Sequence, residues 1–236
     1  MQRYFAIDKK DEYLILSNDD FHHITNVMRM KDNDEIEAVY EGHLYLSSIE
    51  SIKDKTVKIK KEIDNKNDKY PYIRLIIPTL KEQKLDFIFQ KCTEIGINEF
   101  IVIPFERSNV RYDERKEKVK LERWIRICKE ASEQSKRTDI PLITLEKNFN
   151  FAKELDGLKL ICSTNEKNNY IKYALKNKGE YDKITLVIGP EGGISEKEEA
   201  YLEEMGFSKI TLGTQIMRAE TVPMFLTSII RYEYTE

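Results

Sequence analysis

The segment Gly-Pro-Glu-Gly-Gly at residues 189–193 has the composition of a loop that binds a small ligand through its backbone. It follows the apolar run Ile184–Ile188, which predicts a strand, and precedes Ser195 and Glu198, whose spacing predicts a helix with a capping box. Glycines between a strand and a capped helix let a ligand approach the backbone at the carboxyl end of a parallel strand, although a plain tight turn has the same composition. The residues expected to contact a ligand here are Ile188, Gly189, Pro190, Glu191, Gly192 and Gly193.

The spacing of these glycines argues against a dinucleotide. A dinucleotide-binding loop has the pattern G-x-G-x-x-G, and an acidic residue about 20 positions later binds a ribose hydroxyl. Here the glycines are spaced differently, and the next expected strand ends in Leu212-Gly213-Thr214-Gln215, without an acid. Glu191 would also repel a diphosphate, so a cationic sulfonium ligand suits the loop better.

Two further strand ends carry polar or glycine residues. The segment Leu160–Glu166 includes Ser163 and Thr164, and Leu212-Gly213 leads to Ile216–Thr221. Because the carboxyl ends of parallel strands meet at one edge of a sheet, we expect the three strand ends to surround one small molecule. The additional residues expected to bind it are Ser163, Thr164, Leu212, Gly213, Ile216 and Met217.

The elements that must position these loops follow Pro71, where apolar strands alternate with amphipathic helices. The helical pattern is clear at 84–95, and Gly96 stands where a left-handed cap belongs. This alternation predicts an α/β fold with a mostly parallel sheet covered on both faces. The expected strands are 72–77, 100–103, 158–162, 184–188 and 210–212, and the expected helices are 84–95, 115–134, 170–175 and 222–231, besides the one that begins at Ser195.

The first part of the chain has a different pattern, with short alternating or β-branched runs that predict a small β-barrel. Glu41-Gly42 is expected to form a hairpin turn, and a short helix is expected at 20–30, started by Asn18, Asp19 or Asp20. The polar segment 64–71 predicts a linker between domains at 1–68 and 72–236. The expected strands of the barrel are 3–7, 35–40, 43–46 and 56–59.

Composition excludes several classes of protein. The net charge of -3 argues against wrapping nucleic acid through bulk charge, although residues 105–137 hold 11 Lys/Arg against 7 Asp/Glu. The three cysteines, Cys92, Cys128 and Cys162, are odd in number and lack paired spacing, which argues against a disulfide framework and a zinc ribbon. No metal-ligand spacing is present elsewhere, so we expect no metal. No run is long and apolar enough to span a bilayer, and the first residues are charged, so we expect a cytoplasmic protein.

The pattern IGPEGGIS..E, followed by LG..IMRAET, resembles the paired signature of the RsmE family, enzymes that methylate N3 of a uridine in 16S ribosomal RNA. The resemblance extends over nearly the whole chain and departs from the family pattern only in apolar exchanges at Met217 and Val222. Its other parts are His23–Arg29, Lys84–Gly96, Arg107-Ser108 and Glu133–Pro141.

The resemblance implies S-adenosylmethionine as cofactor, and 16S ribosomal RNA or the small subunit as partner. It also implies the deep trefoil knot of the SPOUT superfamily, formed by roughly the last 80 residues, an exception to the rule that chains do not thread loops. The family acts as a homodimer packed through the knotted domains, and its N-terminal PUA-like barrel helps to dock RNA.

Methylation of uridine N3 requires loss of its proton and stabilisation of the resulting negative charge. Arg218 is the candidate for that stabilisation, and an ion pair with Glu220 or Glu191 is its alternative role. Glu220 is a candidate base or orienting partner, and Thr221 is expected to cap the last helix. The candidates for RNA contact, each of which has a solvated surface role as its alternative, are Arg29, Lys31, Arg107, Arg111, Gln134 and Arg137.

Two other functions remain open from the sequence. A ribose 2′-O-methyltransferase of the same knotted class would share the glycine loop, but not the segments around Glu133 and Arg218. A non-catalytic RNA-binding module would explain the barrel, but it would leave three ligand-type strand ends without a use.

Overall fold

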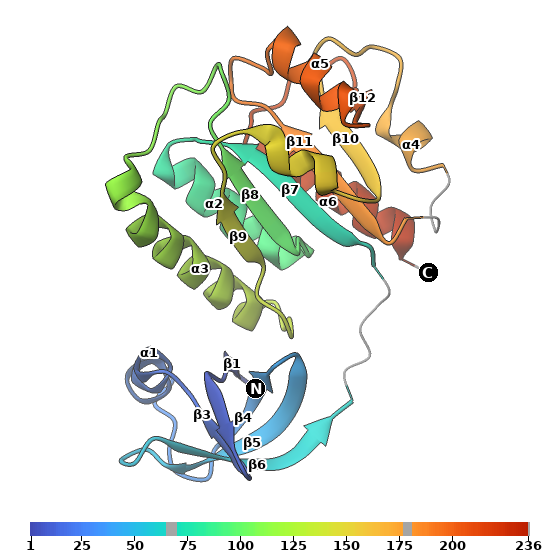
Figure 1. The fold of residues 1–236 in the computed structure, drawn as a ribbon. Helices are drawn as coiled ribbons and strands as arrows, with labels where there is room; N and C mark the ends of the chain where they lie inside the picture. The colour runs from blue at the N-terminus through green and yellow to red at the C-terminus, as the bar shows by residue number, and fades with distance from the viewer. Residues whose placement is uncertain (65–69, 177–180, 236) are drawn as a thin grey trace. The chain divides into compact units, whose positions relative to one another are not determined.

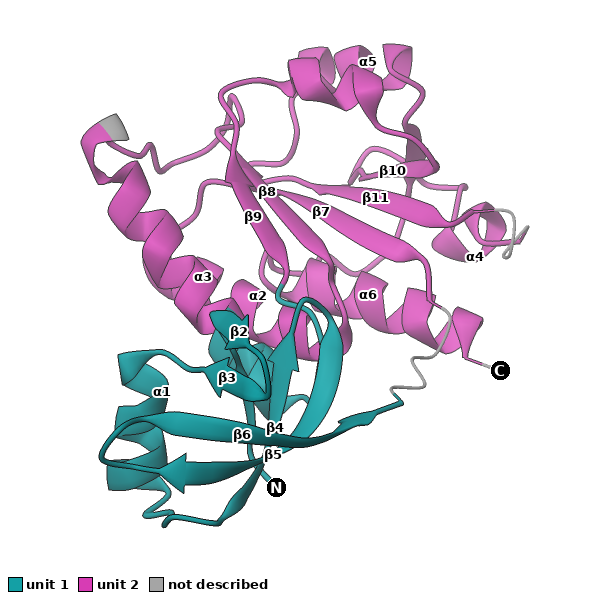
Figure 2. Ribbon diagram, turned by 60° about the horizontal axis from the view of Figure 1, so that its bottom comes forward, with its two compact units in different colours: residues 1–67, 129–140 teal, residues 68–128, 141–236 magenta. Residues whose placement is uncertain are grey.

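The computed structural model describes residues 1–64, 70–176 and 181–235. The chain forms two compact units (Figure 2). Unit 1 comprises Met1–Asn67 and Lys129–Ile140, and unit 2 comprises Asp68–Cys128 and Pro141–Glu236. Most of the predicted linker, residues 65–69, lies outside the described residues. In the part of the chain that is described, no helix is long and apolar enough to cross a membrane.

Unit 1 contains a six-stranded sheet in the order β1-β4-β5-β6-β3-β2. Only β1 and β4 pair in parallel. The two edge strands β1 and β2 are consecutive in the chain and are separated by Ala6 and Ile7 alone, so the sheet curls on itself, as predicted for a small barrel. The strands are β1 (Arg3–Phe5), β2 (Asp8–Lys10), β3 (Tyr13–Ile15), β4 (Glu35–Tyr40), β5 (His43–Ser51) and β6 (Thr56–Ile63).

The predicted hairpin turn and the predicted helix of unit 1 are both present in the structure. Glu41 and Gly42 both have positive φ, 49° and 82°, which confirms the hairpin turn between β4 and β5. The predicted helix exists as α1 (Asn18–His22), which continues into the π-helix η1 (His23–Val27). Its cap is Ser17, one residue before the expected starts, because the Ser17 hydroxyl accepts the Asp20 amide in a capping box.

The segment Lys129–Ile140 belongs to unit 1 although its neighbours in the chain belong to unit 2. Lys129 forms an ion pair with Asp20 of α1, and the guanidinium of Arg3 donates to the Lys136 carbonyl. The Phe5 amide donates to Glu133 at 3.3 Å. Burial raises the pKa of the Glu133 carboxyl to about 7, although the nearby Lys129 ammonium opposes that rise.

Unit 2 contains a second six-stranded sheet, in the order β12-β10-β11-β7-β8-β9, and every neighbouring pair is parallel (Figure 1). This confirms the predicted parallel α/β architecture. The strand β9 was not predicted, and β12 begins two residues before the predicted start at residue 210. The strands are β7 (Tyr72–Pro78), β8 (Glu99–Ile103), β9 (Leu142–Leu145), β10 (Leu158–Cys162), β11 (Lys183–Ile188) and β12 (Ser208–Ile210).

Helices cover both faces of this sheet. On one face, Phe149 of η3 and Leu202 of α5 join a core cluster with alternate strand residues such as Ile76 and Val187. On the other face, Phe89 of α2 packs edge-on against Phe100, and α2 packs against α6. The helices of unit 2 are α2 (Glu82–Ile95), η2 (Glu114–Lys116), α3 (Glu117–Gln134, whose end lies in unit 1), η3 (Phe149–Glu154), α4 (Ile171–Ala174), α5 (Glu196–Glu204) and α6 (Thr221–Tyr234).

The helix ends show which local predictions hold. Gly96 ends α2 with φ of 113°, and Ser195 and Glu198 form the predicted capping box of α5. Thr221 does not cap α6: it is the first helical residue, and Glu220 holds the cap position without a side-chain hydrogen bond. Within α6, Leu226 and Ile230 are fully buried, whereas Phe225 has 39% of its surface exposed.

Candidate functional site

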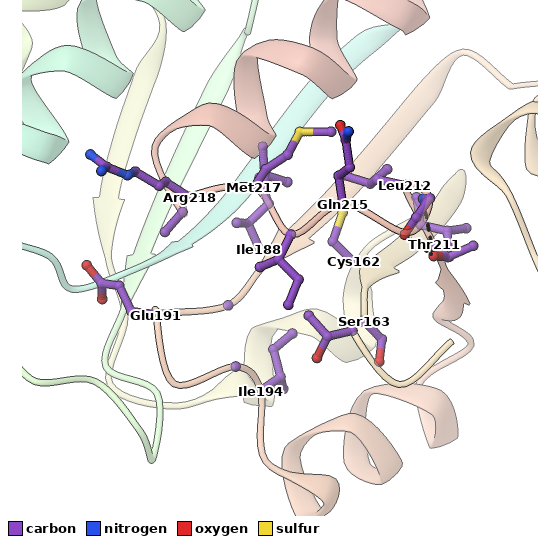
Figure 3. Close-up of a pocket in the computed structure, with 18 of the residues that line it drawn as sticks. Cys162, Ser163, Ile188, Glu191, Ile194, Thr211, Leu212, Gln215, Met217 and Arg218 are labelled. Carbon is purple, nitrogen blue, oxygen red and sulfur yellow. Dashed lines mark hydrogen bonds between the residues drawn. The ribbon is translucent and has the colours of Figure 1, made fainter. Parts of the chain in front are cut away.

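A pocket of about 740 Å³ lies at the carboxyl ends of β10, β11 and β12. This volume falls within the range typical of small-molecule sites. The three loops that follow these strands form its walls, as the sequence analysis predicted (Figure 3). It brings together all twelve predicted ligand-binding residues: Ser163, Thr164, Ile188, Gly189, Pro190, Glu191, Gly192, Gly193, Leu212, Gly213, Ile216 and Met217.

The pocket also contains residues that the sequence analysis did not select, among them Cys162, Lys167, Tyr170, Gln215 and Val222. They lie in the same loops or beside them but carry no motif of their own. Burial raises the pKa of the Cys162 thiol to about 12, so the thiol stays protonated at neutral pH and is not a nucleophile.

Ile194 and Arg107 hold the glycine loop in place. A Cβ atom on Gly189 would lie 2.6 Å from Cγ1 of Ile194, which is buried in the core cluster of this face. The guanidinium of Arg107 donates to the Gly192 carbonyl at 3.1 Å. Gly193 has φ of 75°, a conformation that favours glycine. Arg107, predicted as an RNA contact, therefore supports the loop in this structure.

Ser163 forms part of the pocket wall, but its hydroxyl is engaged. The hydroxyl donates to the buried carboxylate of Glu199 at 2.6 Å, and it accepts the Asn165 amide at 3.1 Å. The backbone amide of Ser163 donates to the carbonyl of Ile210, which lies at the end of β12. These bonds join the β10 loop to α5 and β12.

A cationic side chain from another part of the fold joins two pocket segments. The Nζ atom of Lys84, in the first turn of α2, lies 2.7 Å from Oε1 of Glu191 and 3.0 Å from Oε2 of Glu220. The hydrogen bond to Glu191 and the adjacent Glu220 carboxylate raise the pKa of Lys84 above its ordinary value. The hydrogen bond from Lys84 lowers the pKa of Glu191.

Glu220 has a lowered pKa, which makes its carboxylate a weak proton acceptor. Burial acts to raise its pKa, but a backbone hydrogen bond, the Lys84 ammonium and the nearby Arg218 together hold the pKa below its ordinary value. Its Oε2 atom is buried and has an ion-pair distance to Lys84 without good hydrogen-bond geometry. A lowered pKa makes a carboxylate a weaker base.

Arg218 lines the same pocket and is exposed. Figure 3 shows its side chain and that of Glu191 projecting at one end of the site, with Thr211 and Leu212 at the other end. Its guanidinium has no hydrogen bond or ion pair with any residue that the structure describes, so the ion-pair role considered for Arg218 belongs to Lys84.

The remaining candidates for RNA contact differ in availability. Arg29, Lys31, Arg111 and Gln134 are exposed, and Arg29 has φ of 53° just after the π-helix. Arg137 is mostly buried, with 11% of its side chain exposed, and it forms an ion pair with Asp139 at 2.6 Å. Over residues 1–64, 70–176 and 181–235, no cluster of His, Cys, Asp or Glu is suited to hold a metal ion.

Comparisons with known proteins agree with this architecture. Residues 67–231 match the family described as RNA methyltransferase domain, and residues 16–62 match the RNA methyltransferase PUA domain. Ribosomal RNA small subunit methyltransferase E of Bacillus subtilis is 32% identical over 99% of this chain and 97% of its own length. The enzyme of the same name from Mesomycoplasma hyopneumoniae is 35% identical over 96% and 97%.

Two solved structures are similar over almost the whole chain. Ribosomal RNA small subunit methyltransferase E from Neisseria gonorrhoeae, bound to S-adenosyl methionine, has a TM-score of 0.85 and 26% identity over 98% of this chain and 97% of that one. A methyltransferase of Legionella pneumophila with bound cofactor SAM has a TM-score of 0.87 and 25% identity over 98% and 96%. From the matched residues and the shared fold, the chain belongs to the ribosomal RNA small subunit methyltransferase E (RsmE) family.

Proposed function

We propose that this protein transfers the methyl group of S-adenosylmethionine to N3 of a uridine in 16S ribosomal RNA. The observation that carries the proposal is the convergence of three strand-end loops on one pocket in a chain of the RsmE family. A non-catalytic RNA-binding module gives this pocket no role.

The pocket has the chemistry that S-adenosylmethionine requires. Apolar side chains, including Ile188, Leu212 and Met217, offer surfaces for a purine ring, and the backbone groups of 189–193 and 211–213 offer polar partners. The twelve residues named above would hold the cofactor, which supplies an electrophilic methyl group when bound. Glu191 is already paired with Lys84, so support for this ligand comes from the size and mixed polarity of the walls rather than from that charge.

Two charged residues have separate roles in the proposed reaction. The guanidinium of Arg218 stabilises the negative charge that develops on the uracil ring when N3 loses its proton. Glu220 positions the segment that carries Arg218, because its lowered pKa and its pairing with Lys84 make it a poor base. The proton therefore leaves to water or to a group of the RNA complex.

The two proposed domains, 1–68 and 72–236, have different roles: the first docks RNA, and the second carries the methyltransferase site. The PUA-like barrel docks RNA, and Arg29 and Lys31 of the barrel contact phosphates. Gln134 contacts RNA from the segment Lys129–Ile140, which belongs to unit 1, and Arg111 contacts RNA from unit 2. All four residues are exposed. Arg107 and Arg137 are weaker candidates, because each already interacts with groups of this chain.

The trefoil knot, the homodimer and the cytoplasmic location complete the proposal. Support for the knot comes from strand order: β12 ends at the edge of the sheet, whereas α6 packs against α2. The segment 211–220 therefore crosses the ends of β10 and β11, where their loops also lie. The resemblance to the RsmE family implies the other two features: a homodimer packed through the knotted domains, and a location in the cytoplasm, where ribosomes are assembled.

Methyl transfer to isolated RNA and to small subunits tests the proposal. Both substrates are taken from cells that lack this protein and are incubated with S-adenosylmethionine labelled at its methyl group. Nucleosides are then separated by mass spectrometry, with N3-methyluridine and 2′-O-methyluridine as standards. Label in N3-methyluridine is the expected result. Label in 2′-O-methyluridine would support the ribose methyltransferase, and an absence of both label and cofactor binding would support the RNA-binding module.

A further inference from the structure

Lys84 is a partly buried link between two pocket segments that are distant from it in sequence. Its ammonium pairs with Glu191 of the β11 loop at 2.7 Å and with Glu220 at the start of α6 at 3.0 Å. The Lys84 side chain is 28% exposed and that of Glu220 is 16% exposed. Solvent therefore screens the pair of Lys84 with Glu220 less than it screens pairs on an open surface, whereas the Glu191 side chain is 43% exposed.

Removal of the Lys84 charge would leave two carboxylates near one point with no cation between them. Arg218 is the cation that would replace it at Glu220, because it lies close enough to lower the pKa of that carboxyl, whereas Lys81 has this effect on Glu191. The Arg218 guanidinium has no partner among the described residues, and guanidinium groups bind carboxylates strongly through paired hydrogen bonds.

We propose that Lys84 is a positioning residue that neutralises Glu191 and Glu220 together and thereby leaves Arg218 free to act on the substrate. The inference rests on the proposed function, in which Arg218 stabilises negative charge on uracil. Lys84 touches neither cofactor nor substrate in this account, and its effect on the reaction passes through Arg218.

A simple tether between loops is the competing role, and Glu220→Gln distinguishes the two. If Lys84 only ties the segments together, Lys84→Gln breaks the tie, and a second change at Glu220 cannot restore it. If Lys84 protects Arg218 from capture, removal of the Glu220 charge frees Arg218 again. The double variant Lys84→Gln/Glu220→Gln is then more active than Lys84→Gln alone, whereas Glu220→Gln in the wild-type background lowers kcat, because Glu220 positions the segment that carries Arg218. Additive effects do not produce this change of sign.

The experiment uses the full chain and measures cofactor affinity separately from turnover. Calorimetry with S-adenosylmethionine on the unloaded protein gives Kd, and methyl transfer to small subunits gives kcat. Lys84→Gln should lower kcat about 10- to 100-fold, the loss expected from a misplacement of about 1 Å, with a Kd change below about threefold. The double variant should recover at least about threefold in kcat.

Two further variants complete the comparison. Lys84→Arg keeps the charge and should retain kcat within about threefold of the wild-type value. Lys183→Gln is the matched control, because Lys183 pairs with Asp156 at 2.9 Å at the opposite end of β11. Its kcat and Kd should equal those of the wild type.

Wild-type kcat in Lys84→Gln would overturn the proposal, and so would a double variant no more active than Lys84→Gln. If Lys84→Gln does not fold, the triple variant Lys84→Gln/Glu191→Gln/Glu220→Gln removes the cation together with both carboxylates and should retain more than about a tenth of wild-type kcat. A lower value would equally overturn the proposal. Failure of the proposed function is seen separately, as a wild-type protein that neither binds S-adenosylmethionine nor methylates RNA.

Discussion

Gly189→Ala should damage the cofactor loop through a steric conflict whose size follows from the structure. The added Cβ would lie 2.6 Å from Cγ1 of Ile194 and 3.1 Å from its backbone nitrogen. Carbon atoms in contact prefer about 3.5–4.0 Å, so about 1 Å of overlap must be relieved. Ile194 is 5% exposed and packs in the core cluster with Phe105 and Val187, so the loop has to move instead.

Overpacking of this kind costs about 1–3 kcal/mol, which corresponds to a fall of roughly 2–12 °C in the unfolding midpoint of a chain of this size. The same displacement moves the backbone that faces the ligand, so the Kd for S-adenosylmethionine should rise at least about tenfold. Differential scanning fluorimetry and calorimetry measure the two effects. Gly42→Ala is the control for cofactor affinity: Gly42 lies in the hairpin turn of unit 1 and nothing lies within 4 Å of its Cβ, so the Kd for S-adenosylmethionine should not change, although its positive φ, which Gly189 does not share, makes alanine unfavourable there.

A double-mutant cycle with Ile194→Ala identifies the cause of the damage. Ile194→Ala alone leaves a cavity and lowers stability, but it removes the atom that clashes with the new methyl group. The two changes together should therefore cost at least about 0.5 kcal/mol less than their sum. Strict additivity, or wild-type affinity in Gly189→Ala, would refute the steric reasoning.

Three further predictions concern other parts of the molecule. Arg218→Ala should lower kcat about 100-fold or more while the Kd for S-adenosylmethionine stays within about threefold, and unchanged kcat in single-turnover assays would remove its role in charge stabilisation. Arg107→Ala should weaken cofactor binding, because the Arg107 guanidinium donates to the Gly192 carbonyl of the cofactor loop. Arg111→Ala should weaken RNA binding alone and lower the slope of log affinity against log salt by about 1. Equal effects of the two variants on both ligands would contradict this separation. The pKa of Glu133 is raised to about 7, so the folded state binds the proton of this carboxyl more tightly than the unfolded state does. The contribution of Glu133 to the free energy of unfolding is therefore complete below pH 4.5 and falls as the pH rises to about 7. Thermal unfolding of wild type and Glu133→Gln should show their midpoint difference changing across this window, and a constant difference would be inconsistent with a raised pKa.

Local signals in the sequence were sufficient for much of the fold. The Ser195–Glu198 capping box and the left-handed Gly96 depend on neighbours within a few residues, and both were predicted. The strand β9, Leu142–Leu145, was missed because its side chains are exposed or half-buried at the sheet edge and lack a continuous apolar run. Thr221 has the right residue type for a cap, but the Arg218 turn starts α6 without one.

The site was predicted as a set of loops but not as an electrostatic arrangement. Each ligand-type segment follows a strand, so the rule for parallel sheets was enough to bring the three together. The pairing of Lys84 with Glu191 joins residues 107 positions apart, and no local pattern marks it. For the same reason, nothing in the sequence showed that Arg107 would support Gly192, which is 85 positions away. The pairing of Arg137 with Asp139 is local, but charged residues two positions apart need not pair, so the sequence did not predict it either.

The most direct test of the central claim is the nucleoside content of 16S ribosomal RNA in cells that lack this protein. Mass spectrometry of the digested RNA should show that N3-methyluridine is lost, that the wild-type protein restores it, and that Arg218→Ala does not. N3-methyluridine at its normal level in cells without the protein would contradict the proposed function.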